Sequence, residues 1–163
     1  MFICYTQALY MSTMSVGIIR NVSYKLFFNT VLSMDIVLLV GRILFGGFFI
    51  MGGAMHFMKL KDMTEYARTK GAPMPKLSVM GTGMVIMFAG LAVVFGVYQS
   101  ISLLVISAFL LVITPIMHAY WKVADPNMKM MEMQMFLKNM ALLGASLALY
   151  VFSSEWPISL LSL

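Results

Sequence analysis

Four apolar stretches constrain this chain more than any other feature of its sequence. They cover residues 36–57, 77–98, 101–120 and 136–152. An α-helix rises about 1.5 Å per residue, so about 20 apolar residues cross the roughly 30 Å hydrocarbon core of a bilayer. Three of the stretches reach that length, whereas the fourth is shorter and starts with polar residues. The sequence therefore predicts an all-α, polytopic membrane protein built as a bundle of four transmembrane helices.

The composition agrees with this class. Hydrophobic residues make up 61% of the chain and charged residues only 10%, and the mean hydropathy is +0.93, well above that of an ordinary soluble domain. Four spans leave little of the 163 residues for a separate soluble domain. We therefore expect one membrane domain over residues 34–163, preceded by a doubtful extension over residues 1–33.

The net charge of +5 comes from basic residues gathered in two connections between the spans. These are Lys59, Lys61, Arg68, Lys70 and Lys76 in the first, and Lys122, Lys129 and Lys138 in the second. The segments on the other side of the membrane carry only Arg20 and Lys25. The positive-inside rule then predicts that both connections are cytoplasmic and that both termini face outward. Contact with the headgroups of the lipid bilayer explains the high pI better than nucleic-acid binding, because these short loops have no room for a groove-reading element.

Residues 1–33 mix polar and apolar positions without the basic, apolar and small-residue order of a secretory signal. Two interpretations stay open: Met34 is the true start and the upstream piece is mis-assigned, or the piece is an N-terminal arm. Cys4 is the single cysteine and lies in this segment. Neither a structural disulfide nor a cysteine nucleophile is therefore proposed.

Small residues predict where the helices touch, because close backbone approach drives helix association in lipid. Gly46 and Gly53, seven residues apart, share one helix face with Arg42. Two further small-residue pairs at four-residue spacing are Ala92…Gly96 and Gly144…Ala148. The polar segment 60–70, followed by Gly71, predicts a short surface helix.

Arg42 is the most informative single residue of the spans. A guanidinium within a membrane helix is costly, so it must snorkel to the headgroups, pair, or serve a polar cavity. Snorkelling and a buried hydrogen-bonding role both stay open. His56 and His118 lie near the cytoplasmic ends of their spans, and His56 is interpreted as an interfacial hydrogen-bonding residue.

The end of the third span and the start of the fourth carry several polar and aromatic side chains. The chain leaves the third span near residue 120, turns through Asp125 and Pro126, and re-enters near residue 136. A hairpin of this length is expected to gather His118, Trp121, Glu132, Lys138 and Asn139 in one cluster. The alternative is that Lys138 snorkels to headgroups and Glu132 caps or pairs on a solvated loop helix.

The sequence resembles the DoxX family from residue 34 to about residue 151. The resemblance rests on residues 42–60 (RILFGGFFIMGGAMHFMKL), the turn at 71–75 (GAPMP) and residues 118–126 (HAYWKVADP), followed by Glu132, Phe136, Lys138 and Asn139. It implies a four-helix integral membrane protein of the bacterial or archaeal inner membrane. Some relatives are described as membrane subunits linked to thiosulfate:quinone oxidoreduction, others belong to membrane oxidoreductase assemblies, and most have no assigned activity. Many members have a glutamate early in the second span, where this chain reads MGTGM at residues 80–84, so Arg42 requires another acceptor.

Three functions compete. In the first, the chain is a membrane subunit of a redox complex, in which Arg42 or His118 bonds a quinone carbonyl and Tyr120 and Trp121 line the ring. Without a cysteine cluster, a dinucleotide fingerprint or a haem-binding pair, the chain would receive electrons from a carrier in a partner subunit. The second is a small transporter, for which the absence of an internal repeat leaves little room. The third is an assembly or packing factor without chemistry.

Methionine is frequent, with 19 residues in the chain. A group of them lies in the second basic connection: Met128, Met130, Met131, Met133 and Met135. Thioethers suit Cu(I) as ligands. Methionine more often fills irregular packing and forms adaptable partner surfaces, so no metal site is predicted.

Overall fold

The computed structural model describes residues 34–153, 156 and 159. The chain divides into two compact units, residues 1–38 and 39–163. Residues 34–38 of the first unit are helical, and the contacts and sites described below belong to the second unit. The two interpretations of residues 1–33, including Met34 as the start, concern positions outside the described part.

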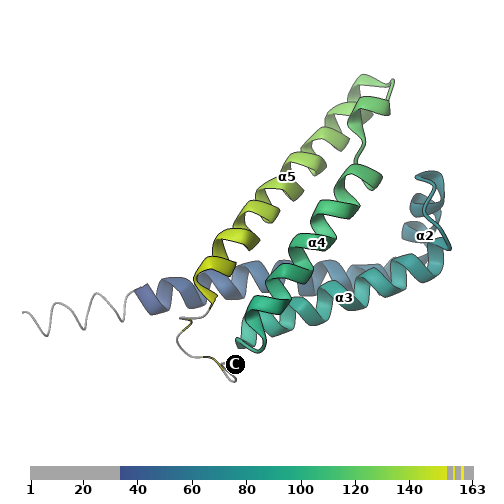
Figure 1. Cartoon of the computed structure of the whole chain (residues 1–163). Helices are drawn as coiled ribbons and strands as arrows, with labels where there is room; N and C mark the ends of the chain where they lie inside the picture. The colour runs from purple at the N-terminus through teal and green to yellow at the C-terminus, as the bar shows by residue number, and fades with distance from the viewer. Residues whose placement is uncertain (1–33, 154–155, 157–158, 160–163) are drawn as a thin grey trace, which may run out of the picture. The chain divides into compact units, whose positions relative to one another are not determined.

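The described elements are helices (Figure 1). They are the helix Met34–Met58, α2 (Leu60–Thr69), α3 (Pro75–Phe95), α4 (Gln99–Met117), the short 3-10 helix η1 (Tyr120–Lys122) and α5 (Pro126–Val151). Four helical segments are long and apolar enough to cross a membrane. The predicted four-helix membrane fold is thus confirmed, while the outward orientation of both termini stays a prediction.

The fourth helix begins earlier than its apolar stretch predicts. It starts at Pro126 rather than near residue 136, because the carboxylate of Asp125 accepts a hydrogen bond from the Met128 amide at 2.8 Å. A side-chain cap followed by proline at the first helical position is a strong start signal. Hydropathy alone does not detect this, since the first turns of α5 are polar and methionine-rich.

Glycines bring helix Met34–Met58 into close contact with α3, as the shared face of Gly46 and Gly53 predicts. A Cβ at Gly46 would lie 2.6 Å from the carbonyl oxygen of Gly90, and one at Gly53 would lie 2.6 Å from that of Gly83. The Gly144…Ala148 pair marks no such contact, because a Cβ at Gly144 would meet nothing within 4 Å. The backbones therefore touch at the first pair of helices and not at Gly144.

Helices α4 and α5 run side by side (Figure 1). Leu103 and Ile106 of α4 are fully buried, and the Ser146 hydroxyl of α5 donates to the Leu103 carbonyl oxygen at 2.9 Å. Gln99, at the start of α4, donates through Nε2 to the Ser153 carbonyl oxygen at 2.8 Å. Hydrogen bonds between helices satisfy polar groups that lipid cannot.

Helix α2 confirms the short surface helix expected from residues 60–70. It packs against α3, buries Ala67, and is followed by Gly71 in the left-handed conformation (φ 77°), where glycine has no steric penalty. The Tyr66 hydroxyl oxygen lies 3.2 Å from the Met117 carbonyl oxygen. The two basic connections therefore meet at one end of the helices, as their charge predicts.

Candidate functional site

A buried carboxylate joins the two basic connections. Glu132 is only 7% exposed. Its Oε1 accepts hydrogen bonds from the Lys70 Nζ at 2.6 Å and from the Tyr66 hydroxyl at 2.9 Å. Its Oε2 accepts one from the His118 Nδ1 at 2.8 Å. We call Tyr66, Lys70, His118 and Glu132 the Glu132 cluster.

Local structure explains how the four side chains converge. Tyr66 and Lys70 are four residues apart and so share one face at the end of α2. His118 directly follows α4, whose last turn contains Pro115. Glu132 lies in the capped first turns of α5 that precede its apolar stretch. The early start of α5 is therefore what brings Glu132 to the cluster.

Three donors compensate the burial of the carboxylate. A charge removed from water is tolerated when its lone pairs are satisfied by charged or polar donors. Burial, followed by the hydrogen bond to Glu132 and the charge of that carboxylate, raises the pKa of Tyr66. The phenol therefore remains a donor at neutral pH. The Lys70 ammonium lies 5.1 Å from the centroid of the Tyr66 ring, which adds a cation–π contact.

A mostly apolar cavity of about 270 Å³ adjoins the cluster. Tyr66 and His118 belong to both. The other polar residues at its wall include His56, Lys138 and Asn139, and the apolar ones include Phe48, Phe49, Ile86, Phe109, Leu110, Ile113 and Met117. A concave apolar site with a few polar groups is the usual form of a small-molecule site.

Asn139 is the unusual member of this wall. Its side chain is 8% exposed, yet it makes no hydrogen bond within the part of the chain that the structure describes. Its amide atoms are not among the described polar atoms that are fully shielded without a partner, so the amide reaches open space at the cavity. The Asn139 amide is therefore available to bond a polar atom of a ligand in the cavity.

The two histidines present defined tautomers to the cavity. His56 Nδ1 lies 2.8 Å from the Gly52 carbonyl oxygen, and His118 Nδ1 lies 2.8 Å from the Glu132 carboxylate. Since both partners are acceptors, Nδ1 carries the proton in each ring. The Nε2 atom of His118 is then the ring nitrogen left for a ligand: it accepts a hydrogen bond in the neutral ring and donates one in the doubly protonated ring.

The structure brings most of the predicted cluster together, with one exception. His118 bonds Glu132, and His118, Lys138 and Asn139 line the cavity. Trp121 is not at the wall, because its ring packs against Tyr120 and Phe136, with centroids 5.1 and 5.8 Å apart. Lys138 lies above the Phe48 ring at 5.6 Å.

Arg42 lies at the opposite end of α3 from these residues. It is 1% exposed and donates to the carbonyl oxygens of Val93 at 3.3 Å and Val94 at 3.1 Å. Its guanidinium also lies 4.6 Å from the centroid of the Trp156 ring. Snorkelling is thus wrong and the buried hydrogen-bonding role is confirmed, since Arg42 adds side-chain donors to two carbonyls of the last turn of α3.

Tyr66 and Lys70 are the site residues that the sequence did not single out. Their four-residue spacing on an amphipathic helix was the available signal, but it does not reveal a partner 62 or 66 residues away. Among the described residues no group of three or more His, Cys, Asp or Glu side chains could hold a metal ion.

Comparison with protein-family models gives one match. The model described as DoxX matches residues 37–119, slightly more than half of the chain. The matched region includes Arg42, the α2 residues of the Glu132 cluster and His118, and it ends before Glu132. No curated protein and no solved structure matches the chain.

Proposed function

Because this chain belongs to the DoxX family, we propose that this multi-pass membrane protein is a quinone-linked subunit of a redox complex in the cell membrane. The proposed quinone site is the cavity that Asn139 and His118 line. The resemblance of the sequence to a family with such subunits gives the class of function. The apolar cavity beside His118 and Asn139 supports a quinone site in this chain.

The observation that carries the proposal is the Asn139 amide, which lines the apolar cavity and makes no hydrogen bond in the described part of the chain. A quinone ring is flat and apolar, with carbonyl oxygens that accept hydrogen bonds. The Asn139 amide can donate to one of them, and His118 can donate through Nε2 when its ring carries two protons. The phenylalanines and aliphatic residues of the wall suit the ring, since removing apolar surface from water is favourable.

This site differs from the quinone site that the sequence predicts. Arg42 donates to backbone carbonyls at the other end of α3, so it is not assigned to the quinone. Tyr120 and Trp121 pack on each other and on Phe136, and neither lines the cavity. Of the residues predicted for the quinone, His118 is kept, and Asn139 is the second residue proposed to bind it. The electron carrier is assigned to a partner subunit.

Quinone binding by the detergent-purified protein tests the proposal. Extracted quinone is quantified first, and a short-tailed quinone is then titrated against the parent, Asn139→Leu, His118→Phe and the double variant. Losing one buried hydrogen bond should weaken binding about tenfold. The two effects should be non-additive in the double variant, because both groups hold one ligand.

Asn127→Leu is the matched control, since Asn127 is exposed at the start of the same helix. It should bind quinone as the parent does. The proposal fails if the parent neither carries nor binds quinone, or if the losses are equal in Asn127→Leu and Asn139→Leu. Circular dichroism of each variant separates lost binding from lost folding.

An assembly factor is the second candidate, and a specific surface favours it. Met128, Met130, Met131, Met133 and Met135 are all exposed in the first turns of α5. Flexible thioether side chains form adaptable protein-binding surfaces. A protein that binds no quinone but loses a complex partner when these methionines are replaced by serine would support assembly over quinone binding.

A further inference from the structure

The hydroxyl groups at the wall of the Asn139 cavity already donate hydrogen bonds within the protein. Tyr66 donates to the Glu132 carboxylate. Ser78 and Thr82 donate to backbone carbonyl oxygens of residues shortly before them in the chain. The polar atoms left open for a ligand are therefore to be sought among the nitrogens of the wall.

His56 provides one such nitrogen. Its Nδ1 lies 2.8 Å from the Gly52 carbonyl oxygen, so the neutral ring carries its proton there and Nε2 is an acceptor. Nε2 makes no hydrogen bond in the part of the chain that the structure describes. It is also not among the described polar atoms that are fully shielded without a partner. Because His56 lines the cavity, this acceptor is open to a ligand there.

Helix α3 leaves room for the His56 ring at Gly83. A Cβ at Gly83 would lie 2.6 Å from the His56 Cβ and 3.1 Å from its Cγ. The backbone of α3 on one side and the bond to Gly52 on the other therefore hold the imidazole in place. A side chain that is already held loses little conformational freedom when a ligand binds.

His118 presents the same kind of atom from another part of the fold. Its Nδ1 is bonded to Glu132, which leaves Nε2 for a ligand. His56 lies on helix Met34–Met58 and His118 directly follows α4, yet both line one cavity. With neutral rings, two acceptors from different helices thus face a ligand between mostly apolar walls.

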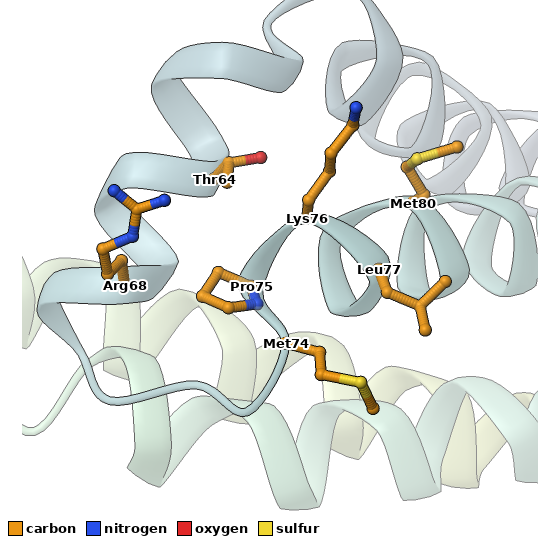
Figure 2. Close-up of a pocket in the computed structure, with 7 residues that line it drawn as sticks. All are labelled: Thr64, Arg68, Met74, Pro75, Lys76, Leu77 and Met80. Carbon is orange, nitrogen blue, oxygen red and sulfur yellow. The ribbon is translucent and has the colours of Figure 1, made fainter.

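Another pocket, of about 340 Å³, lies between α2 and the start of α3, and no histidine is among its described lining residues. Figure 2 shows that its two cationic side chains, Arg68 and Lys76, point away from each other. The Thr64 hydroxyl at its wall is fully shielded. We therefore assign no ligand to this pocket.

We propose that the Asn139 cavity binds a quinol more tightly than the corresponding quinone, and that His56 binds the second hydroxyl of the quinol. This inference rests on the quinone site proposed above. A quinol carries hydroxyl donors at opposite ends of its ring, where a quinone has only acceptors. One hydroxyl donates to His118 Nε2 and the other donates to His56 Nε2. Asn139 serves both forms of the ligand, because an amide donates and accepts.

Anaerobic titration of the detergent-purified, full-length protein with a short-tailed quinol and with its quinone tests the proposal. The measurement is made at about pH 8.5, roughly two units above the ordinary histidine pKa. The parent should bind the quinol about tenfold or more tightly than the quinone. His56→Phe keeps an aromatic ring and removes Nε2, so it should lose about tenfold in quinol affinity. Its quinone affinity should stay within about twofold of the parent, because the neutral imidazole donates nothing to a carbonyl at Nε2.

Thr82→Val is the matched control. Thr82 lines the same cavity, but its hydroxyl already donates to the Ser78 carbonyl oxygen at 2.7 Å. The variant loses a polar group of the wall without losing an open acceptor. It should therefore keep the parent's preference for the quinol.

The monomethyl ether of the quinol tests the second hydroxyl from the side of the ligand. The parent should bind this ether about tenfold more weakly than the quinol, because one hydroxyl is blocked. In His56→Phe this difference should disappear, since the blocked hydroxyl has lost its partner. The comparison in the parent does not depend on the folding of any variant.

The outcomes separate this inference from the proposed quinone site. Equal affinity of the parent for quinol and quinone, equal losses of both ligands in His56→Phe, or equal binding of quinol and ether by the parent would overturn the role of His56 while quinone binding stands. A parent that binds neither quinol nor quinone would overturn the quinone site itself. Circular dichroism of each variant identifies any loss that comes from unfolding, and the ether titration of the parent then decides.

Discussion

The Tyr66 hydroxyl lies 2.9 Å from the Oε1 atom of Glu132, across 66 residues of sequence. This hydrogen bond ties the short helix α2 to the start of α5. The same hydroxyl oxygen also lies 3.2 Å from the Met117 carbonyl oxygen, and Tyr66 lines the Asn139 cavity. One side chain therefore connects three helices beside the candidate site.

Replacing Tyr66 with phenylalanine should destabilise the protein by about 1–2 kcal/mol, because Glu132 loses a donor and remains buried. The free energy of unfolding in mixed micelles is the quantity to measure. Tyr98→Phe is the control, since the Tyr98 side chain is half exposed and makes no hydrogen bond in the described structure. Equal stability of the two variants would contradict the role given to this phenol.

The raised pKa of Tyr66 predicts late ionisation in the folded protein. Near pH 11, about one unit above the ordinary tyrosine pKa, folded parent and folded Tyr66→Phe should show the same phenolate absorbance. After unfolding, the parent should show one phenolate more. Because the folded pKa lies above the unfolded value, the stabilisation is fully present below about pH 10 and is lost as the pH rises through the folded pKa.

Glu132 and Glu65 offer a matched pair of carboxylates. Glu132→Gln should cost about 2–3 kcal/mol of stability, because it leaves the partly buried Lys70 and His118 without their anion. Glu65→Gln removes only an exposed pair with Arg68 and should cost less than about 1 kcal/mol. The free energy of unfolding of the two variants, measured in mixed micelles, tests this order. Similar losses would mean that the Glu132 cluster is no more than a solvated network.

Alanine substitutions at Gly46 and Gly47 distinguish the effect of backbone contact between helices from the effect of helix propensity. Alanine favours a helix by about 1 kcal/mol over glycine, so Gly47→Ala should be neutral or stabilising, because its Cβ would meet nothing within 4 Å. Gly46→Ala would place its Cβ 2.6 Å from the Gly90 carbonyl oxygen and should cost about 1–3 kcal/mol. Thermal unfolding of the two variants checks this difference, and the reverse order would refute the glycine contact.

The sequence predicted the helices and one of their contacts, because both depend on patterns within a single segment. Apolar length marks a span, and the glycine face of Arg42 marks the side that packs. The Glu132 cluster depends on pairing between α2 and α5, which no local pattern contains. Trp121 shows a second limit of local patterns. Its closeness to His118 along the chain suggested a shared site, whereas its ring packs on Tyr120 and Phe136.

The orientation in the membrane is the last prediction. Eight basic residues lie in the two connections that meet at the Glu132 cluster, so this end is expected in the cytoplasm and both termini outside. In a Cys4→Ser background, a membrane-impermeant thiol reagent should label Ser159→Cys in intact cells. Lys122→Cys, in η1 at the other end, should be labelled only after permeabilisation. The reverse pattern would place the Glu132 cluster outside, and any partner that delivers electrons at that end would then have to be extracytoplasmic.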